Sequence, residues 1–418
     1  MCPWRHRWIV CLLLAPQLGA SRVGAQVLSL EEARTRALQA SPELVAARAA
    51  VDAAAARARQ AGAFPNPVVT FAREQTSGGG LTNWQNVALV EQRLDFGGQR
   101  GARREAAALR RDAAMARLAG REAELTYEVT RAYAAAVAAD QRAGHARDAA
   151  EAFARARQVT AARLAGGDIS GYASRRIGLE SARYATLHAA AELTRRTARF
   201  ALAALLGWAG DSVLTLGLHL DQTLAIAPAQ PLDSLRATAV RSRQEIRALL
   251  DEADADAADA RAARREAFPG PLAGLGFKNE RGGGSGPTTS GFVLQFSLPV
   301  PLWDTRGAAS AAFLADARER SAHVDRLRRD ITREVETAWA AMQAVREQIE
   351  AIRPQLGEAS RAALRAAEAA YAEGEISLVE WLDAVRAYQE AESGFATLQA
   401  EYVIQRAALE RAVGARLN

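Results

Sequence analysis

The fold is decided by one stretch, Tyr371-Ala-Glu-Gly-Glu-Ile-Ser-Leu-Val-Glu-Trp-Leu-Asp-Ala384, which has a long helical pattern on either side. Gly374 fits the end of the first helix, because glycine adopts the left-handed backbone of a C-cap without penalty. Ser377 and Glu380 have the spacing of a capping box at the start of the second helix. The stretch therefore predicts the turn of a long helical hairpin.

The chain repeats this turn and the segments around it. A degenerate copy of the turn is Leu164-Ala-Gly-Gly-Asp-Ile-Ser170. The other paired motifs are Ala63-Phe-Pro-Asn-Pro67 with Ala267-Phe-Pro-Gly-Pro271, Arg100-Gly-Ala102 with Arg306-Gly-Ala308, and Leu206-Gly207 with Val413-Gly414. The two copies of each motif are separated by 204 to 207 residues, so one duplication covers nearly the whole chain.

The N-terminus predicts export. Arg5 and Arg7 precede a short apolar core, and Val23-Gly-Ala25 has the small residues of a cleavage site, which together indicate a signal peptide at residues 1–25. The apolar core is too short to span a bilayer, which disfavours the alternative of an uncleaved anchor. Both cysteines, Cys2 and Cys11, lie in this segment, so we expect no disulfide in the mature chain.

Charge and composition exclude several classes of function. Loss of the three arginines of the signal segment lowers the formal net charge from +5 to +2, and no basic block is interleaved with aromatic residues, so we expect no nucleic-acid partner. The histidines are not clustered, and no nucleophile elbow, dinucleotide fingerprint or P-loop occurs. We therefore expect no metal site, no cofactor and no enzymatic activity.

The duplication divides the mature chain into a first repeat at 26–207, a connector at 208–231 and a second repeat at 232–418. Each repeat is expected to hold an ascending helix, a β-hairpin, a very long helix, the glycine turn and a return helix. The strands are predicted at about 67–76, 84–94, 271–281 and 290–300 from alternating apolar and polar residues. Each has the length of a tilted strand that crosses a membrane, and no apolar run after residue 25 is long enough for a membrane helix.

The long helices carry a seven-residue apolar repeat. In the second repeat its positions are Val335, Ala338, Met342, Val345, Ile349, Ile352 and Leu356. This spacing is typical of coiled-coil packing, although Pro354 is expected to kink the helix. An outbound helix of roughly 65 residues would be roughly 100 Å long, which nearly equals a return helix and an ascending helix stacked end to end.

Four strands cannot close a barrel, and an open sheet edge is not viable in lipid, so the chain must assemble. Two copies would supply eight strands, and three copies would supply twelve and leave room for a lumen. Trp84 near one end of a strand, and Phe96 and Trp303 at the other, are candidate aromatic residues of the membrane interface. The fold class is thus mainly α with a membrane β-barrel portion.

The chain resembles the outer-membrane efflux family typified by TolC over roughly residues 28 to 414. The resemblance is carried by Tyr371-x-x-Gly-x-Ile-Ser377, Leu382-Asp-Ala384, the ending Tyr402…Leu409…Gly414 and Phe64-Pro-Asn-Pro67. It implies a homotrimer with a twelve-stranded barrel in the outer membrane and a helical tunnel in the periplasm. It also implies docking to an inner-membrane pump, of the RND type, through a periplasmic adaptor. The segment Gly98-Gln-Arg-Gly-Ala-Arg103 is similar to the CzcC-like cation-efflux branch.

The resemblance also implies roles for residues at the turns. Glu380 and Asp383 match acidic residues that narrow the periplasmic entrance of the family and favour cations, while Ala173 and Ile376 depart from its pattern. The alternative is that Glu380 only caps a helix and Asp383 is only solvated.

A second role implied for the turns is adaptor docking. The candidate residues are Gly167, Asp168, Ile169, Gly374, Ile376, Ser377 and Leu378. Ile376 and Leu378 are expected to be exposed at the tip, and such an apolar tip would need a partner to cover it. The alternative is a plain helix cap.

Two other functions remain open at this point. The channel could serve type I secretion or drug efflux, because the pump largely chooses the substrate. A protein of another class, a soluble periplasmic coiled-coil adaptor or scaffold, would also contain helical hairpins and strands. Adaptors usually carry one helical hairpin between β-domains, so the full duplication favours an outer-membrane channel that extends into the periplasm.

Overall fold

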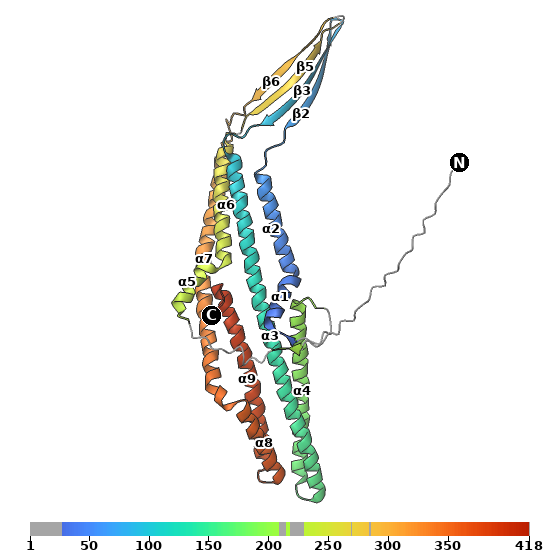
Figure 1. Cartoon of the computed structure of the whole chain (residues 1–418), viewed down its shortest axis with the longest axis vertical. Coiled ribbons are helices and arrows are strands. Elements are labelled where there is room, and N and C mark those ends of the chain that lie inside the picture. Colours follow the sequence, from blue (N-terminus) through green and yellow to red (C-terminus); the bar gives the residue numbers. More distant parts are fainter. Residues whose placement is uncertain (1–26, 209–214, 218–229, 269, 284–285, 418) are drawn as a thin grey trace, which may run out of the picture.

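The computed structural model describes residues 27–208, 215–217, 230–268, 270–283 and 286–417. The molecule is long and narrow, with a β-sheet at one end and two helical turns at the other (Figure 1). The expected signal peptide at 1–25 lies outside the described residues, as does most of the connector at 208–231.

The two halves of the chain share one order of main elements, namely two helices, a β-hairpin, an outbound helical segment and a return helix. The first half comprises β1 (Val27–Leu28), α1 (Leu30–Ala40), α2 (Pro42–Ala61), β2 (Val68–Gly78), β3 (Leu81–Arg93), α3 (Gln99–Gly166), α4 (Gly171–Leu205) and then β4 (Thr215–Leu216). The second half comprises α5 (Leu232–Ser242), α6 (Gln244–Glu266), β5 (Leu272–Arg281), β6 (Thr288–Ser297), α7 (Gly307–Ile352), η2 (Arg353–Gln355), α8 (Glu358–Glu373) and α9 (Leu378–Val413). The short strands β1 and β4 pair in parallel.

The larger sheet is antiparallel and has the order β2-β3-β5-β6. The turn between β2 and β3 consists of Gly79 and Gly80, whose φ angles of 61° and 81° cost glycine nothing. This turn is tighter than the sequence suggested, so β3 starts at Leu81 and not at 84. The predicted end of β6 at 300 was also too late, since the strand ends at Ser297.

One face of the sheet is apolar and exposed. Its large side chains are Val69, Phe71, Val90, Leu275, Phe277, Phe292, Leu294 and Phe296. They lie in cross-strand rows, for example Leu275 opposite Leu294 and Phe277 opposite Phe292. The outer strands β2 and β6 each have one neighbour within the chain, so both outer edges of the sheet are unpaired.

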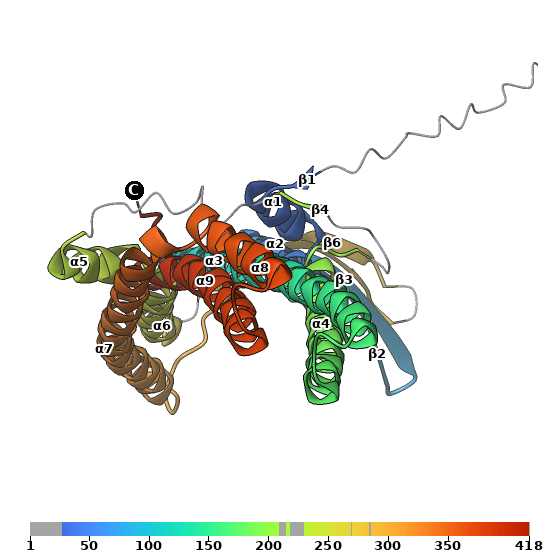
Figure 2. The ribbon, with the colours of Figure 1, turned by 90° about the horizontal axis from the view of Figure 1, so that it is seen from below.

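The helices form a curved layer (Figure 2). The helix α3 runs nearly the whole length of the helical part, and α2 and α4 lie one above the other beside it (Figure 1). In the second half, α6 and α9 are stacked in the same way (Figure 1). The end-to-end stacking that the helix lengths predicted is therefore present in both halves. No helix in the described part of the chain is both long enough and apolar enough to cross a membrane.

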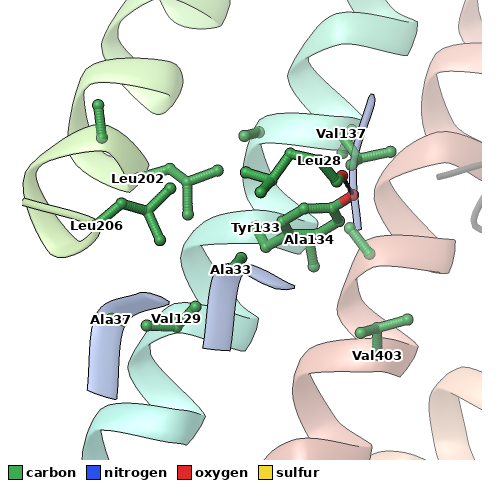
Figure 3. Packing of buried hydrophobic residues seen from close by; sticks show 14 residues of the cluster. Leu28, Ala33, Ala37, Val129, Tyr133, Ala134, Val137, Leu202, Leu206 and Val403 are labelled. Carbon is green, nitrogen blue, oxygen red and sulfur yellow. Dashed lines mark hydrogen bonds between the residues drawn. The ribbon is translucent and has the colours of Figure 1, made fainter. Parts of the chain in front are cut away.

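An apolar cluster fixes the stacking in the first half (Figure 3). Ala33 and Ala37 of α1 are fully buried against Leu202 and Leu206 at the end of α4. The hydroxyl group of Tyr133 in α3 donates a hydrogen bond of 2.7 Å to the carbonyl oxygen of Leu28. These contacts anchor the N-terminal strand and α1 at the junction between α2 and α4.

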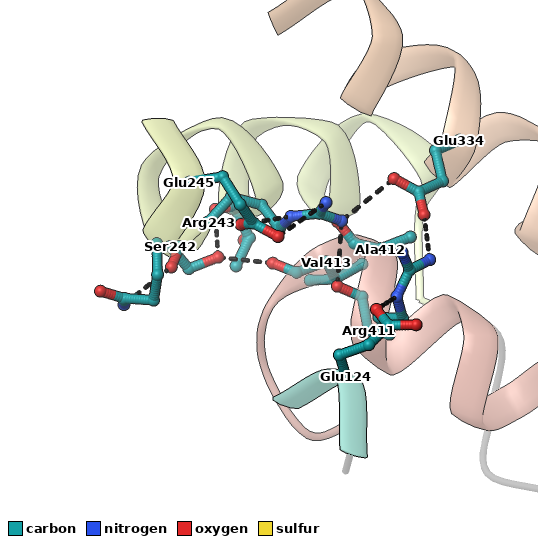
Figure 4. A network of polar contacts seen from close by, with 10 residues as sticks. Glu124, Ser242, Arg243, Glu245, Glu334, Arg411, Ala412 and Val413 are labelled. Atoms are coloured by element: carbon teal, nitrogen blue, oxygen red, sulfur yellow. Dashed lines mark hydrogen bonds and ion pairs between the residues drawn. The ribbon is translucent and has the colours of Figure 1, made fainter. Parts of the chain in front are cut away.

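A polar network fixes the equivalent junction in the second half (Figure 4). The side chain of Arg243, only 8% exposed, donates to the carbonyl oxygens of Arg411 and Ala412 at 3.2 and 3.3 Å. Ser242 donates to the carbonyl oxygen of Val413 at 2.5 Å. The last carbonyl groups of α9 are thus satisfied by donors at the junction between α5 and α6, and the cation stabilises the negative end of the helix dipole.

The long outbound helices differ between the halves. The helix α3 is continuous over 68 residues, which agrees with the expected length. Its counterpart ends after 46 residues at Ile352, and the expected kink at Pro354 is a complete break. The chain resumes as α8 after Gly357, whose φ of 75° interrupts the helix.

Candidate functional site

The two turns lie at the end of the molecule opposite the sheet (Figure 1). Gly167 and Gly374 end their helices with φ angles of 82° and 83°, so both glycines are left-handed C-caps. Ser170 accepts a hydrogen bond from the backbone of Ala173, and Ser377 accepts one from the backbone of Glu380. The turns therefore have the local geometry that the sequence predicted.

An aromatic cluster joins the two hairpins just above their turns. Phe153 of α3 stacks on Tyr184 of α4 with ring centroids 4.2 Å apart. Trp381 of α9 meets Phe153 edge to face at 5.0 Å and stacks on Tyr371 of α8 at 5.3 Å. Arg163 adds a hydrogen bond of 2.6 Å to the carbonyl oxygen of Ala372. The sequence did not predict this joining role, because Phe153 and Tyr184 lie much further from their turn than Tyr371 and Trp381 lie from theirs.

The expected exposure of Ile376 and Leu378 is wrong. Both side chains are partly buried, because they pack against the cluster around Trp381. The large apolar side chains that are exposed near the tips include Leu164, Tyr172 and Val379, with exposed fractions of 40%, 67% and 46%. Contacts between the hairpins, which the local pattern does not encode, caused the difference.

The two candidate gate residues differ in their surroundings. The carboxylate of Glu380 accepts a hydrogen bond of 2.7 Å from the backbone nitrogen of Ser377. This bond, together with that of the Ser377 hydroxyl group, lowers the pKa of Glu380 from its usual value. The carboxylate of Asp383 is 66% exposed and lies 3.6 Å from Arg386. Glu380 therefore completes a capping box, whereas Asp383 has a solvated ion pair as its one contact of this kind within the described ranges.

In the first hairpin, the first helical turn of α4 contains Ala173 and no acidic residue. Asp168, in the turn itself, is exposed, and Ile169 is partly buried. Within the described ranges, no group of three or more histidine, cysteine or acidic residues is arranged to hold a metal ion.

The break in the second outbound helix is held by a buried carboxylate. Glu392 of α9, 7% exposed, accepts hydrogen bonds from the backbone nitrogen of Gly357 at 3.0 Å and from the hydroxyl group of Ser360. It thereby caps α8 from a neighbouring helix. Beside the break, α8 and α9 enclose a half-open cavity of about 420 Å³ lined by apolar residues such as Leu364 and Tyr388.

The three candidate interfacial aromatics lie at the two ends of the sheet. Trp84 is partly buried, with the guanidinium group of Arg73 3.9 Å from its ring centroid. Phe96 and Trp303, in the connections between sheet and helices, are 76% and 93% exposed.

A further apolar stripe runs along α4. Its exposed members are Tyr172, Leu179, Leu193 and Phe200, which repeat at multiples of seven residues. In the lower part of the molecule α4 packs on α3, and α8 packs on α9. Sequence analysis missed this stripe, although its heptad spacing was visible.

The sequence and fold can now be compared with known proteins. The family model for outer membrane efflux proteins matches residues 33–208 and 235–415. The chain belongs to the outer membrane efflux protein family. It is accordingly a passive channel component at the outer membrane rather than an enzyme, and it extends into the periplasm. Members of the family act with an adaptor and an inner-membrane pump in tripartite efflux systems.

Individual relatives agree with this assignment. The cobalt-zinc-cadmium resistance protein CzcC of Cupriavidus metallidurans is 25% identical over 87% of this chain and 85% of its own length. Among solved structures, CusC matches with a TM-score of 0.74 at 19% identity over 92% of both chains. The open state of the MtrE outer membrane channel of Neisseria gonorrhoeae has a TM-score of 0.68 at 22% identity, over 92% of this chain and 89% of its own.

Proposed function

We propose that this outer membrane efflux protein works as a homotrimer whose strands close a twelve-stranded barrel. The observation that carries the proposal is the four-stranded sheet, which has an exposed apolar face and two unpaired edges. Lipid would cover the apolar face, and β6 of each copy would pair with β2 of the next. Three copies leave room for a lumen, whereas two would give a barrel filled by its own side chains.

The helical part supports the same arrangement. The apolar stripe on α4 is exposed, on the side of α4 that is not packed on α3. Packing of the α4 stripe of one copy against α8 of the next would cover Leu179 and Leu193 by coiled-coil contacts. Each copy would then contribute two repeats, at 26–207 and 232–418, joined by the connector at 208–231.

For partners and substrate, we propose an adaptor at the turns, an RND-type pump behind it and metal cations as cargo. The cation proposal is supported by the similarity to a cobalt-zinc-cadmium resistance protein. The docking surface would comprise Gly167, Asp168, Ile169, Gly374, Ile376, Ser377 and Leu378. With Ile376 and Leu378 partly buried, the neighbouring exposed residues Tyr172 and Val379 would supply the apolar contact. Type I secretion or drug efflux remains the second candidate, because the pump chooses the substrate.

For the entrance, we propose that Asp383 narrows the tunnel and concentrates cations, with Glu380 in a lesser role. The exposed carboxylate of Asp383 is available to the lumen, whereas Glu380 is engaged by Ser377. Three copies of a carboxylate around a narrow pore attract cations and repel anions. The membrane-interface role of Trp84, Phe96 and Trp303 belongs to the same proposal.

Single-channel recording in planar bilayers tests the entrance. We expect Asp383→Ala to raise the conductance and to lower the preference for cations. Asp325→Ala is a matched control, because Asp325 is 65% exposed and also pairs with an arginine three residues away. Equal conductance of the wild type and Asp383→Ala would remove Asp383 from the constriction.

The mass of the detergent-solubilised protein tests the assembly. We expect three copies in each particle and heat-dependent electrophoretic migration. A correctly processed protein that remains a water-soluble monomer would refute the channel and would favour the periplasmic adaptor or scaffold.

A further inference from the structure

The four connections between sheet and helices meet at one level of the molecule. Gln92 donates to the carbonyl oxygen of Pro65 at 2.9 Å, and the backbone nitrogen of Leu94 donates to the carbonyl oxygen of Pro271 at 2.9 Å. Arg264 donates to Ser310 at the start of α7 at 3.0 Å. Hydrogen bonds thus tie α6 to α7, and tie the segment at the end of β3 to the connections that precede β2 and β5.

Each connection exposes a large aromatic side chain at this level. Phe64, Phe96, Phe268 and Trp303 are 68%, 76%, 76% and 93% exposed. They lie at the end of the apolar sheet face that is nearest the helices. Gln92 lies on the same face of β3 as Val90, so its bond to Pro65 places the connection with Phe64 towards the apolar face.

Two arginines accompany Phe64. The guanidinium group of Arg100 lies 3.6 Å from the centre of the Phe64 ring. Arg104, one turn further along α3, is exposed and passes the end of α2, where a Cβ on Gly62 would lie 3.4 Å from its Cδ. Arg100 therefore lies against the exposed ring of Phe64, and Arg104 lies beside Gly62, two residues before that ring.

The acidic groups of this region form ion pairs with arginines other than Arg100 and Arg104. The carboxylates of Asp95 and Glu266 lie 4.0 and 3.7 Å from Arg103, and Asp304 lies 3.5 Å from Arg306. Asp95 also accepts a hydrogen bond from the backbone nitrogen of Arg100. Among the residues that the structure describes, the guanidinium groups of Arg100 and Arg104 form no ion pair.

We propose that Arg100 and Arg104 bind the phosphate of an anionic phospholipid in the membrane leaflet nearest the helices, with the ring of Phe64 at the level of the headgroups. The proposal rests on the outer-membrane location and on the proposed placement of the apolar sheet face in lipid. Arginine donates paired hydrogen bonds to phosphate, and exposed aromatic rings settle at the level of lipid headgroups. The continuity of this basic and aromatic surface with the apolar sheet face favours lipid as the occupant.

Quenching of tryptophan fluorescence by bromine-labelled lipids tests the proposal on the full mature protein in detergent. Trp303 is the reporter at the level of the connections. Its contribution to the quenched fluorescence is the part that is lost in the Trp303→Phe variant. We expect labelled phosphatidylglycerol to bind more tightly than labelled phosphatidylcholine, by roughly tenfold at low salt for two arginines. Arg100→Gln with Arg104→Gln should abolish this preference, and the double lysine variant should retain part of it.

Arg365→Gln, which changes an exposed arginine of α8 far from the sheet, is the control and should keep the preference. Equal binding of the two lipids by the wild type, or an unchanged preference in the double glutamine variant, would overturn the lipid site. Quenching of Trp303 by both lipids in that case would leave the membrane placement intact. Absence of quenching by either lipid would instead contradict the placement of the sheet in lipid.

Discussion

The two helical hairpins have the same layout and nearly identical glycine caps, but only the first has a continuous outbound helix. The helix α3 buries a row of small residues along its lower half, among them Ala146, Ala149, Ala152 and Ala156. In the second hairpin α8 is 16 residues long and has no fully buried residue. The comparison shows that a duplicated sequence pattern can give a continuous helix in one copy and a jointed one in the other.

The cause of the difference is local, and its compensation comes from a neighbouring helix. Pro354 cannot donate a helical hydrogen bond, and Gly357 adopts a backbone conformation that favours glycine. The amide group freed at Gly357 donates to the carboxylate of Glu392 in α9. The second hairpin thus depends on a few identifiable contacts where the first depends on continuous packing.

The largest effect is expected from a substitution that removes the contact between the two hairpins. Trp381→Ala should cost about 3–5 kcal/mol of local stability, because the side chain is only 2% exposed and fills the aromatic cluster. Hydrogen exchange should then accelerate at the lower ends of both hairpins. Val159→Ala, at a side chain of α3 that is 41% exposed, is the control and should change exchange little. Acceleration in the second hairpin alone would show that the cluster does not stabilise the first.

A smaller effect, confined to the second hairpin, is expected at the break. Glu392→Ala should cost about 1–3 kcal/mol, because it leaves the donors of Gly357 and Ser360 without their buried acceptor. Amide exchange should rise at the start of α8 and remain unchanged in α3. Glu390→Ala, at an exposed neighbouring position, should leave the break intact. Unchanged exchange at Gly357 in the Glu392 variant would mean that the carboxylate does not hold the break.

The smallest expected effect is a difference between the two turns in how their stability depends on pH. Since the pKa of Glu380 is lowered in the folded state, its contribution is complete above the usual pKa of 4.5 and is lost as the pH falls through the lowered value. Acid should therefore loosen the start of α9, whereas α4, which has no acidic residue in its first turn, should respond less. The measurement is amide-exchange protection, corrected for intrinsic rates, at Trp381 and Ser174. Glu380→Gln should flatten the profile at Trp381, and equal profiles at the two turns would contradict the expectation.

Some features of the candidate site depend on residues close together in the sequence, and others depend on contacts between distant residues. The glycine and serine caps follow from backbone conformation, so their positions could be predicted from the sequence. The partial burial of Ile376 could not, because it depends on Trp381 and Tyr371 of the same hairpin meeting Phe153 of the other. The bond of Glu380 to Ser377, which the capping-box spacing predicted, is present, whereas the role of Glu380 at the entrance stays a prediction.

The sequence by itself determined the duplication, the family, the alternation of the strands and the points where helices begin and end, since these depend on residues close together in the chain. Only the tertiary structure decided which of the side chains expected to be exposed are buried. It also decided how the break between α7 and α8 is tolerated. Glu392 reaches Gly357 across 35 residues of sequence, and Arg243 caps the end of α9 from 168 residues away. Such pairs form only when packing brings distant helices together, and no local pattern of residues specifies them.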